Sequence, residues 1–191
     1  MLSEKVQELI GKSRIVSFDD WSYPNQVLEI FRQAESEGRY LTDEDIASLE
    51  KMQPELSASL QHGKLLRDKV ENIVSQAREI VIHTNPLLIE PGGGLYPPVR
   101  AEACWRDFWH FLRCITYGIS GQSINYTSDL GLKYMEQLYQ ELQVPLDSMV
   151  LGLEQLKKFG LAEFEPTQRY ELEPYFDRLT ESMRHFSAVA Q

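Results

Sequence analysis

The chain has 191 residues, 42% of them hydrophobic and 25% charged, and its 29 acidic side chains outnumber 19 basic ones, giving a net charge of −10. These values are typical of a soluble globular protein of ordinary domain size. The acidic balance argues against binding to nucleic acid or to an anionic membrane surface. No run of 18 or more apolar residues is present, so no membrane-spanning helix is expected. The charged start, MLSEKVQELIGKSR, argues against a signal peptide and favours the cytoplasm.

The N-terminal part of the chain predicts a short first helix, which the segment SFDDWSYPN (17–25) separates from the rest. We interpret residues 1–24 as an N-terminal arm and residues 25–191 as one domain. Further along, YLTDEDIASLEKM (40–52) predicts a helix with Thr42 as its N-cap, because a hydroxyl and early acidic residues both favour a helix start.

Periodicity of apolar residues predicts a long helix over 64–83, KLLRDKVENIVSQAREIVIH, where they recur at three- and four-residue steps. The next stretch, NPLLIEPGGGLYPP (85–98), holds four prolines and three consecutive glycines, which indicates an ordered loop.

The remaining apolar periodicity predicts helices over 101–118, 127–143, 144–160 and 171–188. In the helix over 144–160, Pro145 stands near the start and Gly160 is expected to end it. No hairpin pattern around an Asn-Gly turn is present. The sequence therefore predicts an all-α fold of seven to eight helices with an N-terminal helical extension.

The two cysteines, Cys104 and Cys114, lie ten residues apart. On one helix they would be about 15 Å apart along its axis, whereas a disulfide needs Cα atoms about 4.4–6.8 Å apart. We expect two free thiols in a reducing compartment.

The stretch AEACWRDFWHFLRC (101–114) combines a thiol, charged groups and bulky aromatic rings. Each residue of a helix is rotated by about 100° from the one before it. One face of the predicted helix therefore carries Cys104, Asp107, Phe108 and Phe111. The other side carries Arg106, His110 and Arg113. A face with a carboxylate beside aromatic rings suits a flat conjugated ligand with N–H groups. In the plainer interpretation, the phenylalanines are core, Arg106 and Asp107 form a surface pair, and Cys104 is a small buried hydrophobe.

Five ordered segments resemble the phycobiliproteins, the globin-related proteins of the cyanobacterial light-harvesting antenna. They are EGRYLTDEDIASL, PGGGLY, CWRDFWHFLRCITY, GLKYMEQLYQELQVP and PYFDRLTESM, and they cover roughly residues 27–188. The resemblance implies a globin-like fold that holds a tetrapyrrole. It further implies that Cys104 forms a thioether to a linear tetrapyrrole, that Asp107 contacts the pyrrole nitrogens, and that Arg106 contacts a propionate.

The chain departs from the family pattern at several places. The loop after the cysteine helix, GISGQSIN, has no acidic residue, and His110 stands where the family commonly has a tyrosine. Because a histidine can ligate haem iron, His110 or His83 is a candidate iron ligand.

These features predict a non-enzymatic tetrapyrrole-binding globin that serves the haem or bilin metabolism of a cyanobacterium, with haem oxygenase as one candidate partner. One alternative is a phycobilisome light-harvesting subunit with a covalent bilin on Cys104, and another is a pigmentless regulator that binds phycobilisome proteins. The sequence lacks a P-loop, an HExxH motif and a dinucleotide glycine motif. We expect a cytoplasmic protein, or one at the thylakoid surface. The family that the chain resembles pairs its subunits through N-terminal helices, so the resemblance implies a homodimer. Its contact would be built from Val27, Leu28, Ile30 and Phe31.

Overall fold

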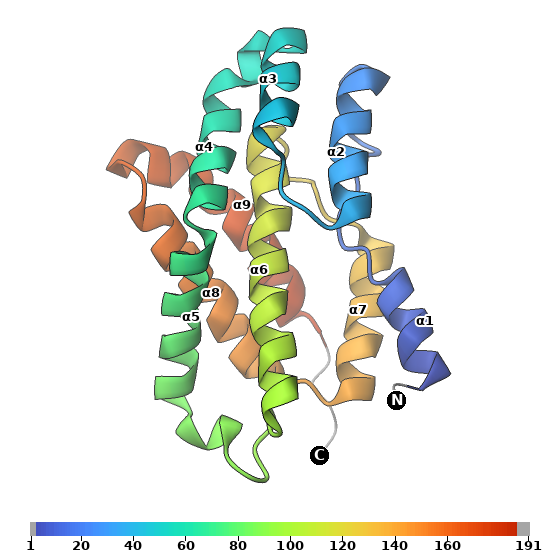
Figure 1. Cartoon of the computed structure of the whole chain (residues 1–191), viewed down its shortest axis with the longest axis vertical. Coiled ribbons are helices and arrows are strands. Elements are labelled where there is room, and N and C mark those ends of the chain that lie inside the picture. Colours follow the sequence, from blue (N-terminus) through green and yellow to red (C-terminus); the bar gives the residue numbers. More distant parts are fainter. Residues whose placement is uncertain (1–2, 187–191) are drawn as a thin grey trace.

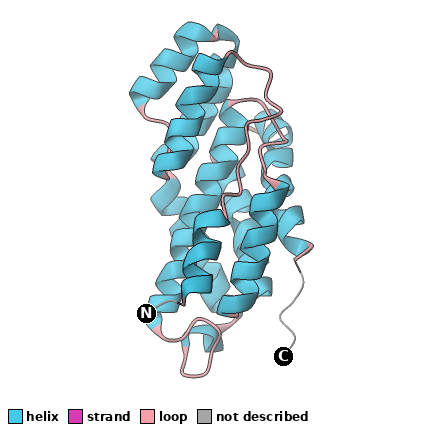
Figure 2. Cartoon of the chain, turned by 90° about the vertical axis from the view of Figure 1, so that its right-hand side faces the viewer, coloured by secondary structure: helices cyan, strands magenta, loops and turns pink. Residues whose placement is uncertain are grey.

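The structure is a computed structural model that describes residues 3–186, and it confirms the all-α prediction. The described part of the chain contains nine α-helices and two short 3₁₀ segments (Figures 1 and 2). The α-helices are α1 (Glu4–Lys12), α2 (Asn25–Glu37), α3 (Asp43–Met52), α4 (Ser57–Asp68), α5 (Val70–Thr84), α6 (Pro98–Ser120), α7 (Asp129–Leu142), α8 (Leu146–Ala162) and α9 (Pro166–Arg184). The 3₁₀ segments are η1 (Pro54–Leu56) and η2 (Pro86–Ile89).

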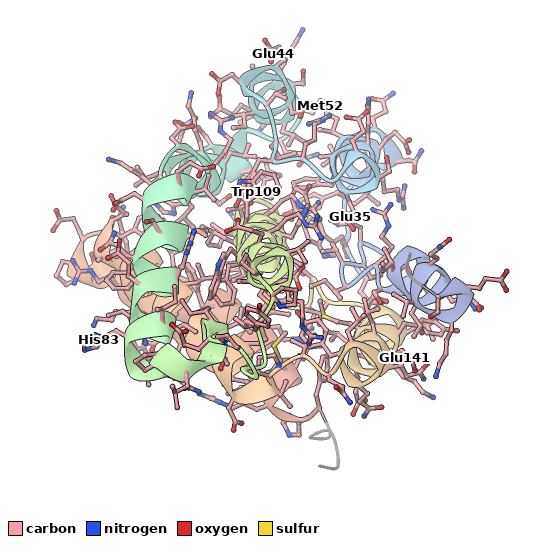
Figure 3. All side chains as sticks on the ribbon, turned by 60° about the horizontal axis from the view of Figure 1, so that its bottom comes forward. Glu35, Glu44, Met52, His83, Trp109 and Glu141 are labelled. Atoms are coloured by element: carbon pink, nitrogen blue, oxygen red, sulfur yellow. The ribbon has the colours of Figure 1, made fainter. Side chains whose placement is uncertain are left out.

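Helix α6 runs through the middle of the molecule and carries most of the candidate site (Figures 1 and 3). It packs against α4, α5, α8 and α9, and every one of its residues from 111 to 120 is buried. A helix that is surrounded in this way needs apolar or small side chains on all sides, which the run FLRCITYGIS largely supplies.

The single helix predicted over 64–83 is wrong in two respects. The helix begins earlier, at Ser57, and the chain breaks at Lys69 into α4 and α5. Lys69 has φ −105° and ψ 1°, outside the helical region. Leu66, Val70 and Ile73 are buried on both sides of the break, so the apolar periodicity continues across it. This break raises the number of α-helices to nine.

Several other helix ends differ from the predicted ones, and two of the differences have a clear structural cause. The helix predicted from residue 171 begins at Pro166, where Glu165 and Gln168 form a reciprocal cap. Residues 187–188 of that prediction lie outside the described residues. Gly160 does not end α8; a Cβ there would lie 2.9 Å from Cζ of Phe176, so the glycine allows α9 to pack closely against α8.

The segment before α2 packs against the rest of the fold. Val6 and Leu9 of α1 form a small cluster with Leu138 of α7. Residues 14–23, which we call the N-terminal strap, contribute four side chains to the main core: Ile15, Val16, Phe18 and Trp21. The division of the chain at residue 24 stays a prediction. No helix within residues 3–186 is both long and apolar enough to span a bilayer.

Candidate functional site

Helix α6 brings three of the predicted site residues together on its buried side. Cys104 is 5% exposed, Phe108 is 0% exposed and Phe111 is 1% exposed. Asp107 is partly buried one helical turn after Cys104, whereas Arg106 is exposed. The helical projection placed Arg106 on the opposite side of the helix from Cys104, Phe108 and Phe111, and the structure does the same.

Contacts with α5 and α8 fix the orientation of this face. A Cβ at Gly152 of α8 would lie 2.0 Å from Cζ of Phe108, so the glycine makes room for the ring. The ring of Trp105 lies 5.6 Å from that of Phe108, and the guanidinium of Arg78 from α5 lies 5.4 Å from the centre of Trp105. Cation–π and aromatic contacts of this kind hold α6 in one rotation relative to its neighbours.

The carboxylate of Asp107 is held by α7. The hydroxyl of Tyr139, itself 5% exposed, donates a hydrogen bond of 3.0 Å to Oδ2 of Asp107. Burial raises the pKa of Asp107 to about 6, against the opposing effects of this hydrogen bond and of Arg106. Among the described residues Tyr139 is the one hydrogen-bond donor to this carboxylate, which has room for about four. Asp107 therefore keeps acceptor capacity that no protein group uses.

The thiol of Cys104 is protonated in this setting. Burial, followed by the charge of Asp107, raises the pKa of Cys104 to about 12, while Arg100 acts in the opposite direction. Arg100 donates hydrogen bonds to the carbonyl oxygens of Leu142 and Gln143 at the end of α7, at 2.7 and 3.1 Å. A thiol with so high a pKa is a weak nucleophile at neutral pH, because the thiolate is the reactive form.

The second cysteine of α6 differs from the first in its surroundings. Cys114 is also buried and free, as predicted, and burial raises its pKa to about 12. The charged groups that act on it are Arg113 and Glu35. Cys104 alone has a carboxylate one turn away on the same face.

The two histidines predicted as iron ligands lie in dissimilar places. Burial, with the charges of Arg113, Arg106 and Arg14, lowers the pKa of half-buried His110 to about 4. His83 is exposed in the last turn of α5, at the outer edge of the molecule (Figure 3). Within residues 3–186 no group of three or more His, Cys, Asp or Glu side chains is arranged to hold a metal ion.

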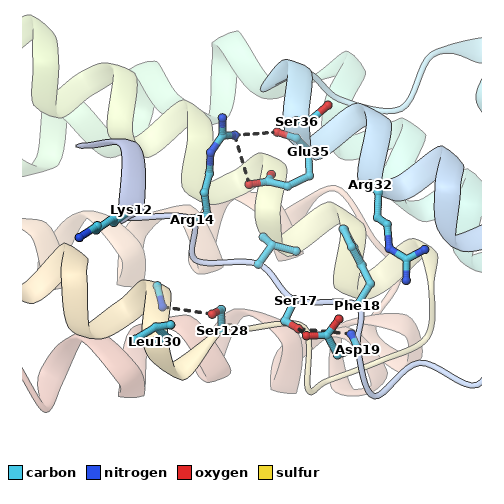
Figure 4. Close-up of a pocket in the computed structure, with 12 residues that line it drawn as sticks. Lys12, Arg14, Ser17, Phe18, Asp19, Arg32, Glu35, Ser36, Ser128 and Leu130 are labelled. Carbon is cyan, nitrogen blue, oxygen red and sulfur yellow. Dashed lines mark hydrogen bonds and ion pairs between the residues drawn. The ribbon is translucent and has the colours of Figure 1, made fainter. Parts of the chain in front are cut away.

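A hollow of about 520 Å³ lies elsewhere, between residues 12–19, α2 and the start of α7 (Figure 4). Its basic side chains are already paired or hydrogen-bonded. Lys12 contacts Glu8 at 2.5 Å, Nη1 of Arg14 lies 3.7 Å from Oε1 of Glu35, and Arg32 donates to Asn25. None of the predicted site residues lines this hollow. We therefore assign the candidate site to the α6 face, where Cys104 lies one turn from a carboxylate that accepts one hydrogen bond among the described residues.

Sequence reasoning missed Tyr139 and Arg100. Tyr139 lies on the apolar stripe of α7 with Leu132 and Met135, all three buried, so its inward direction follows from the periodicity. That it meets Asp107, 32 residues earlier, follows only from how α6 and α7 pack.

Comparison with known proteins identifies the family to which this arrangement belongs. A family model described as phycobilisome protein matches residues 29–183. The chain belongs to the phycobilisome protein family. Among its relatives, the allophycocyanin alpha-B chain of Cyanidium caldarium is 32% identical over 152 residues, which are 79% of this chain and 93% of the relative. The alpha-B subunit of allophycocyanin from a Nostoc species is 29% identical over 160 residues, or 82% of this chain and 98% of the relative.

The family match also shows which part of this chain lies outside the region shared with the family. The alignment with the Nostoc subunit uses 98% of that relative but only 82% of this chain, and the family match begins at residue 29. Helix α1 and the N-terminal strap thus precede the part that the family model matches.

Proposed function

We propose that this chain is a pigment-carrying phycobilisome protein that holds a linear tetrapyrrole, a bilin, covalently on Cys104. Family membership and the similarity to allophycocyanin chains support this role over the haem-metabolism role. The role requires no catalytic group of the chain, and it would place the protein with the phycobilisome in the cytoplasm.

The observation that carries the proposal is the position of Cys104 one helical turn from a carboxylate with spare acceptor capacity. The two residues lie one turn apart on one face, and Asp107 accepts a hydrogen bond from Tyr139 alone among the described residues. A bound bilin would supply pyrrole N–H groups to the free lone pairs of Asp107. Phe108 and Phe111 would then provide the apolar surroundings.

Attachment would proceed by addition of the Cys104 S–H across a carbon–carbon double bond of the pigment. The carbon–sulfur bond forms, and the thiol proton goes to the neighbouring carbon, so no oxidant is consumed. Because Cys104 is only 5% exposed and its pKa is about 12, the covering groups must move before the sulfur can react. Two neighbours of the thiol are the groups whose movement we propose: Arg100, whose charge acts on Cys104, and Tyr139, which holds Asp107.

The haem interpretation lacks comparable support. Haem would require an iron ligand, and His83 is exposed at the edge of the fold while His110 lies in a half-buried site flanked by three arginines.

The test is attachment of a pigment in cells that make linear tetrapyrroles. The purified chain is denatured and examined for zinc-dependent fluorescence, which a thioether-linked bilin retains. We expect a signal in the unmodified protein and in Cys114→Ser, the matched control with the other buried thiol, and no signal in Cys104→Ser.

Two results would contradict the proposal. One is an absence of fluorescence in the unmodified protein although the cells make bilin. The other is a signal that depends on Cys114 and persists in Cys104→Ser. A haemin titration that sharpens a Soret band, lost in His110→Ala, would instead favour the haem interpretation.

A further inference from the structure

The hollow between the N-terminal strap, α2 and the start of α7 differs in charge from the chain as a whole (Figure 4). Over the whole sequence 29 acidic side chains outnumber 19 basic ones. Among the residues that line the hollow the order is reversed, with three basic and two acidic side chains: Lys12, Arg14, Arg32, Asp19 and Glu35. In a protein with a net charge of −10, a concave site with a basic excess attracts an anion that the rest of the surface repels.

The two arginines of the hollow keep most of their hydrogen-bond donors. Nη1 of Arg32 donates to the neutral amide oxygen of Asn25 at 2.9 Å and lies 3.9 Å from a carboxylate oxygen of Glu29. Nη1 of Arg14 donates to the backbone carbonyl oxygen of Glu35 at 3.0 Å, and it lies 3.7 Å from the carboxylate of the same residue. A guanidinium carries five N–H donors, and among the described residues each arginine uses one of them. Each therefore has donors left for a ligand.

The two carboxylates of the hollow already have partners of their own. Oε2 of Glu35 lies 2.6 Å from Nη1 of Arg113, whose side chain is only 6% exposed and approaches from α6. Oδ2 of Asp19 accepts a hydrogen bond of 3.0 Å from the hydroxyl of Ser17. Because the charge of Glu35 is balanced by Arg113, the charges of Arg14 and Arg32 are left in excess.

The floor of the hollow is apolar. Val16 and Phe18 of the strap and Leu130 of α7 line it, and Leu130 is 62% exposed. A Cβ at Gly131 would lie 1.8 Å from the backbone carbonyl oxygen of Arg14, so glycine at this position allows the strap to lie directly against α7. The volume of about 520 Å³ lies within the range of about 300–1,000 Å³ that is usual for small-molecule sites. Such sites combine an apolar lining with a few polar groups, as this one does.

We propose that this hollow binds a small organic anion. The apolar body of the ligand lies on Val16 and Leu130, and its acidic oxygens accept hydrogen bonds from Arg14 and Arg32. Carboxylates and phosphates both offer such oxygens, and hydrogen bonds between two charged groups are about twice as strong as neutral ones. Half of the residues that line the hollow fall within 12–19, before the family match begins at residue 29. The site therefore depends on a segment that the family match does not cover, and it is separate from the Cys104 face.

The test uses the full chain made in cells without linear tetrapyrroles, so it is independent of the proposed function. The probe is anilinonaphthalenesulfonate, an aromatic anion that fluoresces when it leaves water. We expect the fluorescence to saturate at a single probe per chain. Combining Arg14→Gln with Arg32→Gln should weaken the affinity about tenfold or more. The matched control combines Lys51→Gln with Lys158→Gln, which removes the same charge from exposed positions outside the hollow and should leave the affinity unchanged.

Competition against the bound probe identifies the acidic group. Decanoate and decyl phosphate have the same chain length and differ in the head group, and decanol is the uncharged counterpart. We expect at least one of the two anions to displace the probe, and the one that acts at lower concentration names the preferred group. Displacement by decanol as effective as that by the anions would show that charge has no role and would overturn the proposal.

The variants supply three further results that would overturn it. These are the absence of saturable fluorescence in the unmodified protein, an unchanged affinity in the arginine double variant, and an equal loss in the lysine control. If the arginine variant loses its helical circular dichroism spectrum, Leu130→Asp replaces it. That residue is 62% exposed, so the change spares the core while placing a negative charge in the hollow. A folded Leu130→Asp protein with the affinity of the unmodified chain likewise refutes the site.

Discussion

Replacing the buried carboxylate of the candidate site should stabilise the protein at neutral pH. The change is Asp107→Asn, which keeps the shape of the side chain and an oxygen that accepts from Tyr139. In the native protein, burial raises the pKa of Asp107 from 3.8 to about 6. The folded state therefore holds the proton more tightly than the unfolded state does.

The sign and size of the effect follow from this difference. The stability that protonated Asp107 contributes is fully present below pH about 4 and is lost as the pH rises through about 6. At about 1.4 kcal/mol per pKa unit, the loss at pH 7 is about 3 kcal/mol, and at pH 4 it is under about 1 kcal/mol. Asp107→Asn carries no such loss, so its advantage in free energy of unfolding should grow between pH 4 and pH 7.

The measurement is urea unfolding of both proteins across that pH range. The control is Glu102→Gln on the same helix, whose side chain is 68% exposed, and we expect it to change stability by no more than about 0.5 kcal/mol at any pH. An Asp107→Asn protein that is less stable than the native one at pH 7 would show that this carboxylate is fully satisfied in the folded state. Asp107 would then have no free acceptor capacity to offer a ligand.

Two further predictions concern packing and charge around α6, and both are measured by urea unfolding. Gly152→Ala should lower the free energy of unfolding by about 1–3 kcal/mol, because its Cβ would lie 2.0 Å from Phe108. Gly11→Ala should raise it by up to about 1 kcal/mol, because a Cβ there meets nothing within 4 Å. Equal effects of the two changes would contradict close packing at Gly152. Arg113→Met should lower the free energy of unfolding by about 3–5 kcal/mol. Nη1 of Arg113 lies 2.6 Å from Oε2 of Glu35, and the side chain of Glu35, which is only 12% exposed, would lose this partner. Adding Glu35→Gln should recover part of that loss, and a double variant that is no more stable than Arg113→Met would refute the role of the stranded charge.

The candidate face of α6 could be predicted from sequence because helix geometry alone sets the directions of its side chains. A rotation of about 100° per residue places Cys104, Asp107, Phe108 and Phe111 together, and the structure buries three of them almost completely. The contact between Asp107 and Tyr139 could not be predicted in this way. It depends on how two separate helices pack, and the sequence offers only the inward direction of Tyr139.

The break at Lys69 and the burial of the strap escaped prediction for related reasons. Because the kink between α4 and α5 preserves the phase of the apolar residues, periodicity passes over it without a signal. The strap places Phe18 and Trp21 among acidic and polar residues in an irregular spacing, so it resembles a solvated linker. Only the facing residues, among them Gly121 and Gly131, identify it as a packed segment.

The N-terminal strap and the face that carries Cys104 contact different parts of α6. Cys104 lies near the start of the helix and Tyr117 near its end, so at about 1.5 Å per residue they are about 20 Å apart along its axis. The strap contacts the end of α6, where Phe18 lies against Tyr117, whereas Phe108 near its start lies against Gly152 of α8. Pigment attached to Cys104 should therefore keep the same absorption band in Gly131→Ala as in the unmodified chain. A shifted band would mean that the rotation or position of α6 depends on the strap.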